Sequence, residues 1–304
     1  MAVLPHPRAV VLLSLATLAG LVSLAGVACG GSSSRKGFDE NTDPSQPNPP
    51  PAPTSTGDFD KNKVPLPPAP SGEVNEVFGQ SADTLFRLDP KTKAVTQVGL
   101  FNGCTQIIDI ALDEASTLYA VSFTGLYVVD KLTAKCTPIA TGSYPNSLSF
   151  VPKGTVDANA EALVGYEGGD YVRIDTKTGA KTKIGALGGG LVSSGDIVSV
   201  KGGKAYLTVK GTNACTANDC LVEVDPASGK LVKNWGSVEH TDVFGLAFWG
   251  GKVYGFDNLG ELFEVTFGSA GITTTSIAIP SKPPGLSFWG AGSSTSAPLV
   301  PTTQ

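Results

Sequence analysis

From Glu73 onward, the hydrophobic positions fall into short strands separated by turn residues, and these strands recur as a repeated unit. The most regular part of the unit is an apolar strand, a short turn that usually begins with an aspartate, and a second strand rich in Thr and Lys. None of this region has the 3.6-residue period of an amphipathic helix. Five copies of the hairpin begin at Leu85, Leu126, Tyr171, Leu221 and Leu262, 41 to 50 residues apart.

Four of the five hairpins carry an aspartate where the first strand ends. An aspartate at this place accepts hydrogen bonds from the backbone N–H groups of the turn, and a glycine four residues later, Gly179 or Gly229, tolerates a left-handed backbone. We therefore interpret these aspartates as turn residues rather than catalytic ones. They are Asp89, Asp130, Asp175 and Asp225.

Two further short strands precede each hairpin except the first, so that a complete repeat has four strands. Such repeats are typical of the blades of a β-propeller. The first repeat lacks its innermost strand, whereas the segment GLSFW from Gly285 supplies one extra strand. The sequence therefore predicts an all-β fold, a five-bladed β-propeller over residues 73–292, in which the C-terminal strand completes the first blade. A pair of β-sandwiches is the alternative, but it would not explain five copies of one hairpin.

These repeats resemble the β-propeller proteins of bacterial cell surfaces, over residues 73–292. The resemblance implies an architecture rather than an activity, because propellers serve as sugar binders, scaffolds, hydrolases and lactonases.

An apolar run from Ala9 to Ala28 follows Arg8 and ends in small residues directly before Cys29. This N-terminus resembles bacterial lipoprotein signal peptides, which implies that residues 1–28 are removed and that Cys29 carries a lipid. Gly30 after the cysteine resembles the outer-membrane sorting signal of Gram-negative bacteria. The prediction is a lipid-anchored protein of the outer membrane, periplasmic or surface-exposed. An ordinary secretory peptide cleaved near Ala28 is the alternative.

The segments outside the repeats have compositions that do not form a core. Residues 29–72 are rich in Pro and Ser with few hydrophobic residues, so we expect a disordered tether behind the lipidated cysteine. Residues 293–304 are expected to be a disordered tail.

Composition and charge narrow the function classes. The chain has 22 Lys and Arg against 27 Asp and Glu, a net charge of −5, which argues against a nucleic-acid partner. It has two histidines, so His240 is the only one left after cleavage of the signal peptide. No GxSxG, HExxH or P-loop motif is present. Catalysis that depends on a histidine-rich site is therefore disfavoured.

The domain holds four cysteines besides Cys29, an even number that favours disulfides in an exported protein. Cys215 and Cys220 flank a short insertion, and we expect them to bridge each other. This leaves Cys104 to pair with Cys136, although one precedes an inner strand and the other opens an outer strand.

The loops that enter the inner strands, with those between the second and third strands of each blade, form one face of a propeller. We predict that this face binds the ligand. Asp109, Ser147, Asp196, Gly245 and Gly285 occupy one equivalent position at the openings of the inner strands. The residues predicted to form the face are Tyr144, Asn146, Asp109, Asp196, Glu239, His240 and Asp242. Trp249 and Trp289, at equivalent strand ends, are interpreted as packing residues.

Two aspartates at the mouth of a narrow channel allow two interpretations. Asp109 and Asp196, with Asn146 nearby, are candidate oxygen ligands of calcium, the one cofactor considered. Alternatively, the two carboxylates cap the N–H groups of strand ends. The first hypothesis for function is a non-catalytic binding or scaffolding module for a protein, a glycan or a small ligand. The alternative is a glycosidase-like or lactonase-like hydrolase that uses Asp109, Asp196 or Asp242.

Overall fold

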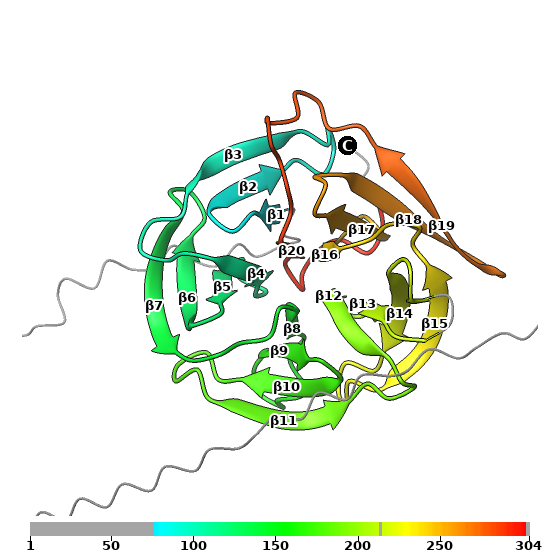
Figure 1. Cartoon of the computed structure of the whole chain (residues 1–304). Helices are drawn as coiled ribbons and strands as arrows, with labels where there is room; N and C mark the ends of the chain where they lie inside the picture. Colours follow the sequence, from blue (N-terminus) through cyan, green and yellow to red (C-terminus); the bar gives the residue numbers. More distant parts are fainter. Residues whose placement is uncertain (1–75, 213–214, 302–304) are drawn as a thin grey trace, which may run out of the picture. The chain divides into compact units, whose positions relative to one another are not determined.

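The computed structural model describes residues 76–212 and 215–301, which form five four-stranded antiparallel sheets around a common centre (Figure 1). The five-bladed β-propeller predicted from the repeats is confirmed, and the described residues contain no α-helix. The predicted signal peptide, Cys29 and the whole tether lie outside the described residues. Within the described ranges, no helix has the length and hydropathy needed to cross a membrane.

Each blade is built from strands that follow one another in the chain, with the exception of the first. The first blade contains β20 (Gly290–Ser293), β1 (Val77–Gln80), β2 (Thr84–Leu88) and β3 (Val95–Leu100). The second contains β4 (Ile107–Leu112), β5 (Leu118–Ser122), β6 (Gly125–Asp130) and β7 (Lys135–Thr141). The third contains β8 (Leu148–Val151), β9 (Ala162–Glu167), β10 (Asp170–Ile174) and β11 (Lys181–Ala186).

The last two blades follow the same order from the centre outward. The fourth contains β12 (Val192–Ser199), β13 (Ala205–Lys210), β14 (Cys220–Val224) and β15 (Leu231–Ser237). The fifth contains β16 (Val243–Trp249), β17 (Lys252–Asp257), β18 (Leu262–Gly268) and β19 (Gly271–Ile277). All six residues of the inner strand β4 are buried, whereas the outer strand β11 has no buried residue. The core therefore lies between neighbouring blades, around the inner strands.

The predicted closure of the ring is confirmed, but by a different strand. β1 pairs with β20 from Val77↔Ser293 to Gln80↔Gly290. The closing strand thus begins five residues after the predicted Gly285. In the segment before it, Phe288 packs edge-on against Phe86 of the first blade and Phe256 of the fifth, with ring centroids 6.2 and 5.1 Å apart. The apolar side chains of this segment fill the space between two blades, and the segment does not form a strand.

The tail predicted from Ser293 onward is packed where the structure describes it, up to residue 301. Ser293 is the last residue of β20, and Ser294 and Thr295 are buried. The backbone N–H of Lys201 donates to the Thr295 carbonyl (2.8 Å), and Ser294 forms a β-bridge with Leu112. The expectation of disorder therefore fails for residues 293–301, because their backbone groups pair with the inner ends of other blades.

The hairpin aspartates act as turn residues, as predicted. Asp175 Oδ1 accepts the N–H groups of Lys177 (2.9 Å) and Thr178 (2.8 Å), and Gly179 has a φ of 70°. The carboxyl groups of Asp89, Asp130 and Asp225 accept turn N–H groups in the same way. These hydrogen bonds lower the pKa of the Asp175 carboxyl, because they favour its charged form.

The disulfide between Cys104 and Cys136 is confirmed, with Cα atoms 5.7 Å apart. The segment that leads to the inner strand β4 first runs beside the outer strand β7, where Asn102 forms a parallel bridge with Lys135. The Cys136 N–H also donates to the Asn102 carbonyl (2.7 Å). This detour brings the two cysteines together, although they belong to opposite sides of the blade.

Candidate functional site

A cavity of about 660 Å³ opens where the inner strands begin. We call the equivalent position at the opening of each inner strand its axial position. Four lining residues directly precede an axial position in the sequence: Ile108, Asn146, Phe244 and Trp289. The axial positions themselves are Asp109, Ser147, Asp196, Gly245 and Gly290, so that Gly290 takes the place predicted for Gly285. Further lining residues come from the ends of second strands and the loops after them, from the segment before β8, and from the start of the outer strand β11. They are Phe123, Ser143, Tyr144, Pro145, Tyr166, Glu167, Gly168, Lys181 and Asn258.

Five of the thirteen residues that line the cavity are aromatic. Phe123, in the loop between β5 and β6, is 59% exposed. Tyr144 and Tyr166 are buried, and each hydroxyl donates to the carbonyl of a hairpin glycine, Gly179 (3.1 Å) and Gly229 (2.7 Å) respectively. These hydrogen bonds fix the two tyrosines, so one part of the wall is rigid while Phe123 projects into solvent.

Polar groups lie among the aromatic rings. Lys181 forms an ion pair with Glu167, and its Nζ lies 6.0 Å from the ring centroid of Tyr144. Asn146 and Asn258 each offer an amide, a group that both donates and accepts hydrogen bonds. The cavity therefore presents apolar ring faces beside a few polar groups, which is the usual composition of a small-ligand site.

Asp109 and Asp196 occupy axial positions next to this cavity, and both residues are 0% exposed. Asp196 Oδ1 accepts the N–H groups of Ile197 (2.6 Å) and Leu148 (3.4 Å), and its Oδ2 accepts the Leu246 N–H (2.7 Å). This one carboxylate thus connects the inner strands of three blades. Asp109 Oδ1 accepts the N–H of Ile110 (2.8 Å).

The two buried carboxyl groups influence each other, and two uncompensated charges so close together are disfavoured, so one of the groups holds a proton. Burial raises the pKa of both, because a charged carboxylate is poorly solvated there, and the charge of Asp196 raises the pKa of Asp109 further. Backbone N–H groups favour the ionised form of Asp196. Asp109 Oδ2 has no N–H or O–H donor among the described residues. We therefore assign the shared proton to Asp109.

The structure separates the residues predicted to bind calcium. Asn146 is exposed and lines the cavity, whereas Asp109 and Asp196 are fully buried and accept backbone N–H groups. Asp242, the third candidate catalytic carboxylate, is half-exposed and pairs instead with Lys210 (3.1 Å). The arrangement agrees with the second interpretation of the aspartates, in which they cap the N–H groups of strand ends.

The remaining predicted residues, Glu239 and His240, lie with Asp242 on the loop between β15 and β16 and do not line the cavity. His240 Nδ1 lies 3.0 Å from Asp257 Oδ2, and the imidazole stacks on Phe263 with centroids 4.1 Å apart. This loop adjoins the cavity, because the N–H of Asn258, a lining residue, donates to the Asp242 carbonyl (3.0 Å).

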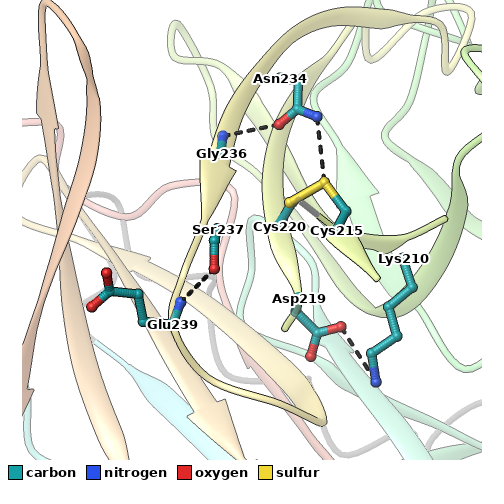
Figure 2. Close-up of a disulfide and its surroundings, with 8 residues drawn as sticks. All are labelled: Lys210, Cys215, Asp219, Cys220, Asn234, Gly236, Ser237 and Glu239. Carbon is teal, nitrogen blue, oxygen red and sulfur yellow. Dashed lines mark hydrogen bonds and ion pairs between the residues drawn. A yellow bond between two sulfur atoms is a disulfide. The ribbon is translucent and has the colours of Figure 1, made fainter. Parts of the chain in front are cut away.

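The disulfide between Cys215 and Cys220 is confirmed, with Cα atoms 5.3 Å apart (Figure 2). It closes a short loop that contains Asp219. The Asp219 N–H donates to the His240 carbonyl (2.9 Å), its carbonyl accepts the Val238 N–H (2.9 Å), and its Oδ2 accepts the Val243 N–H (2.8 Å). The cross-linked loop therefore holds the segment that carries His240.

The sequence interpretation missed most of the aromatic wall, namely Phe123, Tyr166, Phe244 and Trp289. The position of Trp289 directly before an axial residue, shared with Asn146, is the signal that would have found it. The shift of the closing strand to Gly290 hid this relation and made Trp289 look equivalent to Trp249. Instead, Trp249 is the last residue of β16, at the opposite end of an inner strand.

No protein-family model and no curated protein matches the sequence. Solved structures with a similar fold include the gluconolactonase XC5397 from Xanthomonas campestris, 14% identical, which covers 68% of this chain and 75% of its own with a TM-score of 0.43. A chain of a nidogen/laminin complex is 13% identical, with 71% and 97% covered and a TM-score of 0.43. The hydrazine synthase of Kuenenia stuttgartiensis is 15% identical, with 68% and 64% covered and a TM-score of 0.38. At these identities the likeness concerns the fold and assigns no ligand.

Proposed function

We propose that this protein is a non-catalytic binding module of the bacterial cell envelope, and that the cavity at the mouth of its propeller takes a carbohydrate. The aromatic wall with its interspersed amides is the observation that carries the proposal. Sugar rings have apolar C–H faces that pack on aromatic side chains, and hydroxyl groups that pair with amide and charged groups. The volume of about 660 Å³ suits an oligosaccharide unit better than a flat protein surface.

The burial of the axial aspartates argues for binding rather than hydrolysis. In glycosidases the two carboxyl groups stand about 5–9.5 Å apart, with the scissile bond between them. Asp109 and Asp196 are instead fully buried, and neither has exposed surface. A glycosidic oxygen in the cavity therefore cannot reach either carboxyl group. This arrangement favours the binding module over the alternative hydrolase.

Calorimetric titration of the purified full chain with N-acetylglucosamine oligomers, glucose oligomers and soluble peptidoglycan fragments tests the proposal. We expect one of these probes to bind. Phe123→Ala removes an exposed ring of the wall and is expected to weaken that binding tenfold to a hundredfold, about 1.4–2.7 kcal/mol. The matched control is Leu132→Ala, which removes a 78% exposed side chain from a hairpin turn that does not line the cavity. Absence of binding, or equal affinities of the two variants, would contradict the proposal.

The location in the envelope is a separate part of the proposal and rests on the lipoprotein-like N-terminus. Cys29→Ser removes the only thiol that the resemblance marks for lipidation. We expect the variant to leave the membrane fraction in cell fractionation, and the native protein to follow the outer membrane. A variant that stays in the membrane fraction would show that Cys29 is not the anchor.

A further inference from the structure

A histidine and two carboxylates converge beside the cavity, on the face where the inner strands begin. His240 Nδ1 lies 3.0 Å from Asp257 Oδ2 and 3.5 Å from Glu261 Oε2. One ligating atom from each residue lies within 4.8 Å of the other two, and no other group of this kind occurs in the described residues. His240 comes from the loop before β16, and the two carboxylates flank the short loop between β17 and β18.

The contacts of this cluster are not satisfied by hydrogen bonding alone. A ring nitrogen carries at most one hydrogen, so His240 Nδ1 donates to only one of the two carboxylates that face it. Asp257 is 2% exposed at its side chain, and His240 is the sole positively chargeable partner of either carboxylate among the ion pairs of the described residues. Glu261 is half-exposed, yet it turns toward the same nitrogen. The cluster therefore holds an excess of negative charge that a dication would neutralise.

The distances from the imidazole nitrogen to the two carboxylate oxygens suit zinc. Nitrogen and oxygen ligands bind Zn²⁺ at about 2.0–2.1 Å in a tetrahedral arrangement, which places neighbouring ligand atoms about 3.3 Å apart. The observed separations of 3.0 and 3.5 Å lie on either side of this value. Zinc also accepts a mixed imidazole and carboxylate ligand set, whereas calcium takes six to eight oxygen ligands.

The surroundings hold the ligands in place. Asp257 Oδ1 accepts the N–H groups of Leu259 (3.0 Å) and Glu261 (2.9 Å), which leaves Oδ2 directed at the imidazole. The His240 ring stacks on Phe263, and its backbone carbonyl accepts the Asp219 N–H. Such supporting contacts orient ligands before a metal arrives and reduce the cost of ordering them.

We propose that His240, Asp257 and Glu261 form a zinc site with three protein ligands and a fourth position open to water or to an oxygen of a bound ligand. Zinc binding through Nδ1 requires that the hydrogen of the neutral imidazole is on Nε2. The ring therefore changes its tautomer but loses no proton. Asn258, next to Asp257, lines the cavity, so the site adjoins the proposed carbohydrate pocket. The zinc proposal does not depend on that pocket being used.

Titration of the full chain with Zn²⁺ in a calorimeter tests the site directly. We expect the native protein to bind one equivalent and to gain thermal stability by mass action, and Ca²⁺ at the same concentration to bind much more weakly. Glu261→Gln keeps the shape of a half-exposed side chain but removes a charged ligand, and is expected to weaken zinc binding at least tenfold. His240→Ala is expected to abolish binding at this site.

Glu239→Gln is the matched control, because Glu239 is a neighbouring carboxylate outside the cluster. It should bind zinc as tightly as the native protein. Circular dichroism of each variant without metal shows whether it is folded. If His240→Ala does not fold, Glu261→Gln still tests the site. The proposal is wrong if the native protein does not bind zinc, or if Glu261→Gln and Glu239→Gln bind it equally.

Discussion

Replacing Asp109 by Asn isolates the proton shared by the two buried aspartates. In the native pair, Asp109 holds that proton beside Asp196, whose carboxylate accepts three backbone N–H groups. The side-chain amide introduced by Asp109→Asn can accept the Ile110 N–H with its oxygen and donate to Asp196 with its nitrogen. The variant therefore keeps the hydrogen bonds of the pair but has no proton to lose.

The expected magnitude follows from counting protons. Above pH 5 an unfolded aspartate, with a pKa of about 3.9, is ionised, whereas the folded pair keeps one proton because its pKa is raised. The folded state then binds one proton more than the unfolded state. The contribution of this extra proton to the free energy of unfolding is complete below the unfolded pKa. It is lost as the pH rises, at about 1.4 kcal/mol per pH unit, until the folded pair ionises. Asp109→Asn should not show this loss.

Urea unfolding of the full chain at pH 5, 6, 7 and 8 measures the effect. The free-energy difference between the variant and the native protein should grow in favour of the variant with pH. Groups outside the pair are common to both proteins, so their protonation cancels in the difference. The turn aspartates also cancel, because they are ionised in both states above pH 5. A difference that stays constant from pH 5 to 8 would refute the shared proton.

Asp196→Asn is the companion variant, because it distinguishes the two members of the pair. The amide of Asp196→Asn has one oxygen and one nitrogen. In one orientation its nitrogen faces the Leu246 N–H, and in the other it faces the Ile197 N–H, so that one backbone donor loses its acceptor. Leaving one buried N–H without an acceptor costs about 1–3 kcal/mol at every pH. We therefore expect Asp196→Asn to be less stable than Asp109→Asn throughout. Equal stabilities would contradict the assignment of the proton to Asp109.

Two further predictions concern the framework. Replacing Cys104 and Cys136 by Ala opens a loop with a sequence separation of 32 and should destabilise the domain by about 3.7 kcal/mol in urea unfolding. Replacing Cys215 and Cys220, with a separation of 5, should cost about 2 kcal/mol. Equal losses would contradict this ranking. In Gly290→Ala the added methyl would lie 2.3 Å from a buried carboxylate oxygen, so we expect a loss of about 1–3 kcal/mol in thermal unfolding. Gly99→Ala, with no atom closer than 3.7 Å, is the control, and equal effects would show that the axis tolerates a side chain.

The architecture was largely predictable because its signals are local. Each hairpin is marked by an apolar strand and a turn such as that of Asp175, and the repeat spacing fixes the number of blades. The closing strand carries no such signal. Gly290 has no side chain because one would collide with Asp109, and a side chain at Gly292 would crowd the Ile110 carbonyl, whereas the apolar Phe288 just before them packs between blades. Hydrophobic pattern therefore pointed to the wrong five residues.

The candidate sites were only partly predictable, since they depend on how the blades meet. Tyr144 and Asn146 were found from their place in a loop that enters an inner strand. His240 was found as a face residue, but Asp257 and Glu261 belong to a hairpin loop whose approach to it depends on the packing of the β15–β16 loop. Likewise, the sequence placed two aspartates at equivalent positions but could not show that their carboxyl groups share one proton.

The closure of the first blade by β20 also determines when the chain can finish folding. β1 is made early in synthesis, but its partner Gly290–Ser293 leaves the ribosome more than two hundred residues later. Until then the inner edge of β1 has exposed N–H and C=O groups, which are open to pairing with other chains. A contact of such sequence separation also slows folding, because a long loop must close before it forms. We therefore expect aggregation to be most frequent when translation is delayed or stops before Gly290–Ser293 is made.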